Sequence, residues 1–192
     1  LLSIFFITIS LLSTFLRMGL QSALFRFYFD YDSVEEKKTV VSTTFILLLI
    51  NLLLASLTVF MLSPQLSQLF FNNDSYSIHI SLITYISGFK ILNIIPFTIF
   101  RANKLSQKYV VYNFFILIIK LSTIIYLVVS LNYGLLGVLY GTLLVNIFST
   151  VILYFSIRSD FSFTFSFDVS KKLVSFGFPL IFSNLGGFII EW

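Results

Sequence analysis

The sequence predicts an all-α, polytopic transmembrane helix bundle, and three observations support this fold class. First, 58% of the residues are hydrophobic and only 10% are charged, whereas soluble domains carry about 25% charged residues. Second, the mean hydropathy is +1.00. Third, long apolar runs follow one another along the chain. Because the backbone finds no water inside a bilayer, and because these runs lack the alternation of β-strands, we expect each run to be a helix.

Six apolar runs are expected to cross the membrane. They cover residues 1–16, 40–62, 78–100, 109–131 and 135–157, and a last run that begins near Leu173. The four runs in the middle of the chain have roughly 22 or 23 residues each, which at about 1.5 Å per residue crosses a hydrocarbon core of about 30 Å. Ser63 and Pro64 are expected to close the second run. Since the chain begins and ends inside apolar runs, we expect a fragment of a longer protein.

The basic residues are distributed unevenly between the connections, and this predicts the orientation. None lies in the connections 64–77 and 132–134, whereas ten of the twelve lie in the alternate connections or at their borders. These ten are Arg17, Arg26, Lys37, Lys38, Arg101, Lys104, Lys108, Arg158, Lys171 and Lys172. By the positive-inside rule the basic side is cytoplasmic. We therefore expect a multi-pass protein of the cytoplasmic membrane with its Lys- and Arg-rich loops inside the cell.

The two remaining basic residues, Lys90 and Lys120, lie inside expected spans. Along adjacent antiparallel helices they stand roughly 16 and 18 Å from Arg101 and Lys108, hence at nearly the same depth near the membrane midplane. A lysine there costs about 2.5–3.5 kcal/mol and usually faces a bundle interior or an aqueous cavity. We expect at least one of them to line a hydrated cavity that accepts an anion. The alternative is a lysine tolerated through a carbonyl or tyrosine partner.

The connection after the first run, residues 19–38, combines aromatic residues with charges. Residues 35–38 read as a solvated turn. Arg26 lies among aromatics and well before that turn, on a helix that could continue from the first span. Gly19 and Ala23 have the four-residue spacing that lets a neighbouring helix approach closely.

Several classes of function lack the residues they need. The chain has no cysteine and a single histidine, His79, which excludes thiolate chemistry and a zinc site built from this chain alone. We find no catalytic motif, no metal site and no cofactor motif, and a net charge of +4 spread over membrane loops does not indicate nucleic acid. Within the spans, Glu191 is the only candidate partner for the buried cations. We therefore expect a transporter of a negatively charged substrate rather than an enzyme or a proton relay.

Five stretches occur in an order and spacing that resemble the polysaccharide repeat-unit flippases of the multidrug/oligosaccharidyl-lipid/polysaccharide exporter superfamily. They are GLQSALFRFYFDY (19–31), LSPQLSQLFFNN (62–73), IFRANKLSQKYVVYN (99–113), IIYLVVSLNYGLLGVLYG (124–141) and LVSFGFPLIFSNLGGFIIEW (173–192). The resemblance covers nearly the whole chain. It implies that residues 1–158 are the first helical lobe without its first helix, and that residues 159–192 are a cytoplasmic linker and the start of the second lobe.

The resemblance also implies a function. The protein would move undecaprenyl-diphosphate-linked oligosaccharide from the inner to the outer leaflet of the bilayer, with polysaccharide polymerase and chain-length proteins as partners. Arg26 and Arg101 match the family pattern, whereas Lys90 and Lys120 follow from their depth alone. These four residues are the predicted binding residues for the anionic substrate.

Three alternatives stay open at this stage. A lipid-linked peptidoglycan-precursor flippase has similar chemistry. A drug/cation antiporter of the same superfamily would need a carboxylate inside its cavity. A membrane-bound glycan polymerase or acyltransferase would need catalytic residues in an outer loop, and the expected outer loops offer only Asp74 and His79.

Overall fold

The computed structural model describes residues 2–71, 73 and 76–191, and all regular structure among them is helical, as predicted. The helices are α1 (Leu2–Arg17), α2 (Leu20–Asp30), α3 (Val34–Phe71), α4 (Ser77–Leu92), α5 (Ile94–Ala102), α6 (Ser106–Ile125), the π-helical turn η2 (Tyr126–Ser130), α7 (Gly134–Ser156), the 3₁₀ turn η3 (Arg158–Asp160) and α8 (Phe167–Glu191). Asp74 and the side chain of Glu191, both considered above, lie outside the described part of the structure.

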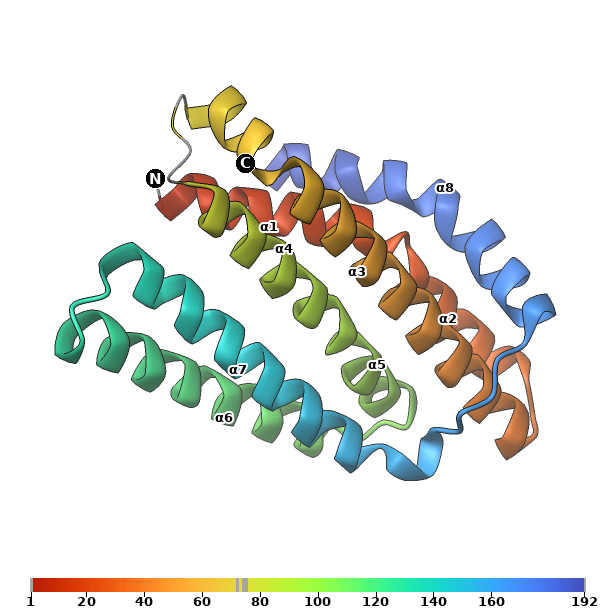
Figure 1. Ribbon diagram of the computed structural model, residues 1–192. Helices are drawn as coiled ribbons and strands as arrows, with labels where there is room; N and C mark the ends of the chain where they lie inside the picture. The colour runs from red at the N-terminus through yellow and green to blue at the C-terminus, as the bar shows by residue number, and fades with distance from the viewer. Residues whose placement is uncertain (1, 72, 74–75, 192) are drawn as a thin grey trace.

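Five helical stretches of the described chain are long and apolar enough to cross a membrane. They are Phe5–Asp30 (α1 with α2), Val34–Gln68 (α3), Ser77–Ala102 (α4 with α5), Ser106–Ser130 (α6 with η2) and Gly134–Ser156 (α7). The predicted transmembrane helix bundle is therefore confirmed. The long helices run side by side, with α6 and α7 as an antiparallel pair at one edge and α8 at the other (Figure 1).

Two predicted boundaries are wrong. The first span does not end at Leu16, because the helix resumes after a break at Met18 and Gly19 and continues as α2 to Asp30. Residues 20–29 are mostly apolar and complete a stretch that sixteen residues alone are too short to form. Pro64 likewise lies inside α3 instead of closing the span. We conclude that Arg17 belongs to a span and not to a loop.

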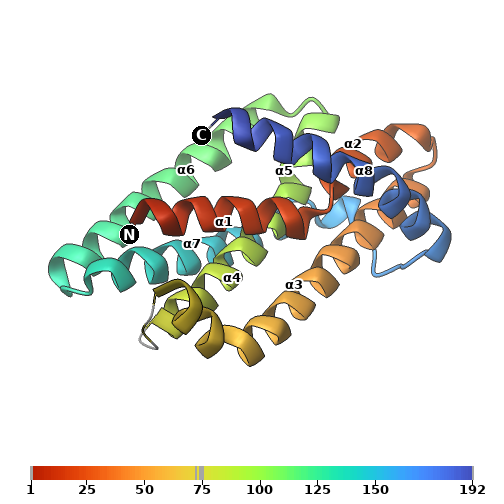
Figure 2. The same ribbon diagram turned by 90° about the horizontal axis from the view of Figure 1, so that it is seen from above.

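Helix α4 lies at the centre of the bundle and packs against α1, α3 and α7. Figure 2 shows α1 beside α4, with the α6–α7 pair on one side and α3 on the other. The main apolar core joins α2, α3, α4 and α5 through fully buried residues such as Leu24, Val41, Ile91 and Ile95. No residue of α6 is buried, so this helix presents most of its surface outward from the bundle.

The bend between α4 and α5 at Asn93 is stabilised by side chains of α7. Pro96 has no backbone N–H, so the Leu92 carbonyl loses its usual helical donor. The Tyr154 hydroxyl donates to this carbonyl instead, at 3.0 Å. Asn93 donates to the Ser149 hydroxyl at 2.9 Å and accepts from the Thr150 hydroxyl at 2.8 Å. Because the polar groups at the bend are satisfied, the bend is compatible with the membrane interior.

We expect Tyr154→Phe to destabilise the protein by about 1–3 kcal/mol, because it leaves the Leu92 carbonyl without a donor in an apolar environment. The measurement is the apparent melting temperature in detergent. Tyr133→Phe removes an exposed tyrosine hydroxyl and is the matched control. Equal melting temperatures for Tyr154→Phe and the control would show that the bend does not need this bond.

Helix α8 crosses the α1–α2 break at a contact between two glycines. A Cβ atom added to Gly177 would stand 2.5 Å from the Met18 carbonyl oxygen, and a Cβ atom on Gly19 would meet the Gly177 backbone. Nearer the start of α8, the Lys172 ammonium donates to the Tyr31 hydroxyl at 3.1 Å. This hydrogen bond raises the pKa of Lys172 above its ordinary value. The close backbone contact fixes α8 against the break.

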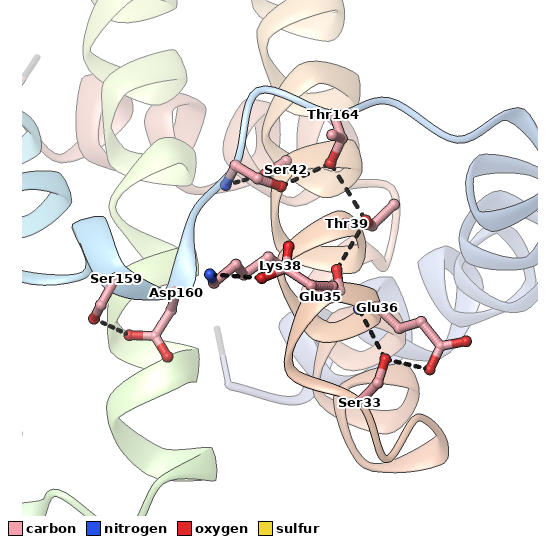
Figure 3. Close-up of polar contacts among 10 residues, drawn as sticks. Ser33, Glu35, Glu36, Lys38, Thr39, Ser42, Ser159, Asp160 and Thr164 are labelled. Carbon is pink, nitrogen blue, oxygen red and sulfur yellow. Dashed lines mark hydrogen bonds and ion pairs between the residues drawn. The ribbon is translucent and has the colours of Figure 1, made fainter.

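The connection between η3 and α8 is held against α3 by hydroxyl groups. The Ser162 backbone N–H donates to the Ser42 hydroxyl at 2.9 Å, and the Thr164 and Thr39 hydroxyls are 3.3 Å apart (Figure 3). At the start of the same helix, Ser33 accepts a hydrogen bond from the Glu36 backbone N–H and caps it. The predicted cytoplasmic linker is therefore attached along its length to the start of α3.

We expect Gly177→Ala to lower the apparent melting temperature in detergent, with a destabilisation of about 1–3 kcal/mol, because neither backbone can yield without separating the helices. Ser175→Ala, on the exposed side of the same helix, controls for the change in composition. If Gly177→Ala is as stable as this control, the close crossing of α8 does not occur in the membrane protein.

Candidate functional site

Arg17 ends α1 at the point where the first span breaks. Its Nη1 atom donates to the Gln21 side-chain oxygen at 3.0 Å, across the break. Its Nε atom is buried and has no hydrogen-bond partner among the described residues. Gly19 makes this geometry possible because it adopts a positive φ of 65°, which glycine tolerates without steric cost. The break thus places a guanidinium group with unused hydrogen-bonding capacity inside a membrane span.

A pocket of about 360 Å³ opens at this break. It is lined by Arg17, Gly19, Gln21, Ser22, Phe25 and Arg101. Two guanidinium groups, one amide and one hydroxyl therefore face a small volume, and no carboxylate lines it. The first turn of α2 also lies in the pocket wall, and the N-terminus of a helix favours negative charge. The pocket has the composition of an anion-binding site.

The two lysines inside the spans lie close to Arg17. The charges of Arg17 and Lys120 both act on the Lys90 ammonium, so α1, α4 and α6 bring three cations together. Lys90 is exposed although much of the protein surrounds it, and Lys120 is half-buried. Neither lysine is therefore enclosed in the packed core. Within the described residues neither lysine has a hydrogen-bond or ion-pair partner, so no carbonyl or tyrosine partner accounts for them.

Lys90 and Lys120 lie at similar distances from the ends of their spans, roughly 18 and 21 Å along the helices from Ala102 and Ser106. Arg17 lies nearer to these ends in space, because it lines the same pocket as Arg101, which stands next to Ala102. We call the end of the bundle at Asp30, Ala102 and Ser106 the basic end, because its connections and the helix ends beside them carry Lys37, Lys38, Lys104, Lys108 and Arg158. The acidic residues of the described spans, Asp30, Glu35 and Glu36, all lie at the basic end. The cations therefore stand deep in the membrane without compensating carboxylates of the described chain.

Arg26 is placed differently from the other predicted binding residues. Its side chain is exposed, approaches Asp30 at 3.8 Å and stacks over the Phe176 ring at 4.6 Å from the ring centroid. It does not line the pocket that contains Arg101. The structure brings Lys90 and Lys120 together and sets Arg101 in the neighbouring pocket, whereas it places Arg26 in the contact between α2 and α8.

Sequence reasoning missed Arg17 as a site residue because the first span was ended at Leu16. One signal could have found it: a run of sixteen residues is too short to cross a bilayer, while residues 20–29 are apolar enough to complete the span. With that boundary, Arg17 lies inside an expected span, as the two lysines do.

Other features of the described structure offer less chemistry. A pocket of about 440 Å³ between α1, α3 and α4, and one of about 410 Å³ between α6 and α7, are lined almost entirely by apolar side chains. No group of three or more His, Cys, Asp or Glu residues could hold a metal ion in the described part of the chain. The cation cluster and the pocket beside it are the features suited to a charged ligand.

These observations describe a bundle of helices long and apolar enough to cross a membrane, with cationic side chains at the α1–α2 break and within α4 and α6. The chain belongs to a family described as polysaccharide biosynthesis protein, whose model matches residues 1–191. The family membership confirms the predicted resemblance and assigns the protein a role in polysaccharide synthesis or export. Comparisons with curated proteins and with solved structures gave no match.

We expect Lys120→Met to raise the apparent melting temperature of the ligand-free protein in detergent, by an amount equivalent to about 1 kcal/mol or more. The substitution removes a poorly hydrated charge and its repulsion from Lys90. Lys108→Met, at an exposed position nearer the start of α6, is the matched control. A fall in the melting temperature would show that Lys120 has a stabilising partner and is not an open cation.

Proposed function

We propose that the protein translocates oligosaccharide repeat units, linked through a diphosphate to undecaprenol, from the inner to the outer leaflet of the cytoplasmic membrane. One observation carries the proposal: three cations without carboxylate partners among the described residues lie within membrane spans, with Arg17 and Lys120 near enough for their charges to act on Lys90, in a member of a polysaccharide biosynthesis family. An anionic diphosphate bound at the cluster would offset the cost of these charges, which is about 2.5–3.5 kcal/mol for each unpaired lysine.

The mechanism follows from separating the two parts of the substrate. The polyprenyl tail is apolar and stays in lipid, whereas the diphosphate and the sugars need a polar route across the bilayer. Arg17, Lys90 and Lys120 supply positive charge inside the membrane, where a phosphate without a partner is least stable. Charge-assisted hydrogen bonds from these groups replace the water that the phosphates lose. The helices would then expose the site first to one side of the membrane and afterwards to the other.

The direction of transport rests on the distribution of basic residues. The basic end carries Lys and Arg in its connections or in the helix ends beside them, and the connections at the opposite end carry none. By the positive-inside rule the basic end faces the cytoplasm, where lipid-linked repeat units would enter. The polymerase and chain-length proteins proposed as partners would receive the substrate on the other side.

Other classes fit the described residues less well. A drug or cation antiporter would need a carboxylate at depth, and in the described spans the carboxylates lie at the basic end. A polymerase or acyltransferase would need a catalytic set outside the membrane, and His79 alone does not form one. We therefore propose a transporter and not an enzyme.

Complementation tests the function. The protein is expressed at equal membrane abundance in cells that lack their own repeat-unit flippase, and surface glycan and intracellular lipid-linked repeat units are measured. We expect surface glycan to return with the unmodified protein and to fall at least about tenfold with Lys90→Gln or Lys120→Gln, since a charged hydrogen-bonding group is lost. Lys104→Gln in the loop before α6 and Lys108→Gln in the first turn of α6, both exposed at the basic end, are the controls.

The results of this experiment test the transport function and the binding site separately. No return of surface glycan with several different repeat units, with the protein shown in the membrane, would contradict the flippase assignment. Full activity of both lysine variants would contradict the cation cluster as the binding site while leaving the transport class standing.

A further inference from the structure

The site carries more positive charge than a diphosphate can balance. A diphosphate that joins a lipid to a sugar has one negative charge on each phosphate, as phosphodiesters do. The cluster and the adjoining pocket contain four cations, Arg17, Lys90, Lys120 and Arg101. No described carboxylate lines the pocket or lies at the depth of the cluster. A substrate with only a diphosphate would therefore leave two of these four positive charges without a counter-charge from the substrate or from the described residues around them.

The cations also differ in kind along the membrane normal. The deep cations include two lysines, which act as compact point charges suited to phosphate. The pocket nearer the basic end has two arginines, whose planar forks match the geometry of a carboxylate in a bidentate manner. The Nε atom of Arg17 is buried and unpartnered among the described residues, so this guanidinium group has an unused hydrogen-bond donor.

The lysines and the arginine pocket follow one another along the bundle in the same order as the diphosphate and the sugars of the substrate. Lys90 and Arg101 lie on one bent span, roughly 16 Å apart along it, with Arg101 near the end at Ala102. A diphosphate at the lysines would carry its tail in the membrane and its sugars toward the basic end. The first sugars would then reach the pocket. There the side chains of Gln21 and Ser22 could form hydrogen bonds with sugar hydroxyls, and the exposed ring of Phe25 could contact an apolar sugar face.

We propose that the pocket formed by Arg17, Arg101 and the first turn of α2 binds a carboxylate on the sugar part of the substrate, and that the protein therefore selects acidic glycans. This inference rests on the proposed function and adds the class of sugar. The carboxylate would lie between the two guanidinium groups and against the N-terminus of α2, whose backbone N–H groups favour an anion. Arg17 is shared between the two parts of the site and couples the carboxylate to the diphosphate.

Two synthetic lipid-linked disaccharides test the proposal. They are identical in lipid and diphosphate, and one sugar carries either a uronic carboxylate or the neutral hydroxymethyl group in its place. Binding to the complete protein in detergent is measured for each. We expect the unmodified protein to bind the acidic compound at least about tenfold more tightly, as a charge-assisted hydrogen bond implies.

Variants test which residues cause the preference for the acidic compound. Arg101→Gln should reduce the preference for the acidic compound to about threefold or less, and Arg101→Lys should restore part of it, because charge returns without the planar fork. Lys104→Gln, exposed in the following loop, should leave both affinities unchanged. Lys90→Gln should weaken the binding of both compounds by the same factor, because Lys90 acts on the diphosphate that they share.

The results that would contradict this proposal differ from the result that would contradict the proposed function. Equal binding of the two compounds by the unmodified protein, or equal loss of both in Arg101→Gln, overturns the proposal and leaves the flippase assignment intact. Competition by phosphatidylglycerol for the Arg101-dependent binding, with no effect of the uronic carboxylate, would assign the pocket to a lipid phosphate and also overturn it. If neither compound binds and their lipid diphosphate alone does not bind either, the proposed function itself fails.

Discussion

The free energy of holding positive charge inside a membrane constrains this structure more than any other interaction. Arg17, Lys90 and Lys120 come from three different helices inside the spans, where each ion loses hydration and the charges of Arg17 and Lys120 both act on Lys90. Apolar side chains at these positions would make a more stable bundle. The three cations therefore lower the stability of the protein. Their presence is explained if an anionic ligand must pass this part of the membrane and binds to them. The same argument accounts for the position of the described carboxylates, which lie toward the basic end and do not neutralise the cluster.

Two irregularities of the helices place the site. The break at Met18 and Gly19 turns the first span so that Arg17, Gln21 and Arg101 face one pocket. The bend at Asn93 lies close to Lys90 and is held by hydrogen bonds from α7, including that of Tyr154. In both places backbone groups leave the regular helical pattern, which a bilayer tolerates only where protein or a polar cavity surrounds them. The first irregularity opens onto the pocket with Arg17 and Arg101, the second is enclosed by side chains of α7, and the crossing of α8 at Gly177 holds the first of them in place.

The sequence predicted the fold class well, because the hydropathy of runs such as 78–100 and 135–157 leaves few alternatives to a spanning helix. It also predicted that Lys90 and Lys120 share a depth, since this follows from helical rise alone. The position of Arg17 could not be obtained from hydropathy with the first span ended at Leu16, and its contact with Gln21 depends on the tertiary geometry of the break. The placement of Arg26 on Phe176 depends on how α8 packs, which no local pattern encodes. Pro64 was read as a helix end, although a long apolar helix continues through it.

Chemical accessibility at Lys120 tests the central claim most directly, namely that the cation cluster faces a hydrated cavity. The chain has no cysteine, so Lys120→Cys introduces a single reporter thiol. The account predicts that a membrane-impermeant, negatively charged thiol reagent modifies this position in intact membranes. It predicts no reaction for Ile118→Cys, which lies on the same helix with its side chain exposed outside the bundle. If Lys120→Cys is as unreactive as Ile118→Cys from both sides of the membrane, the cluster does not line a hydrated cavity.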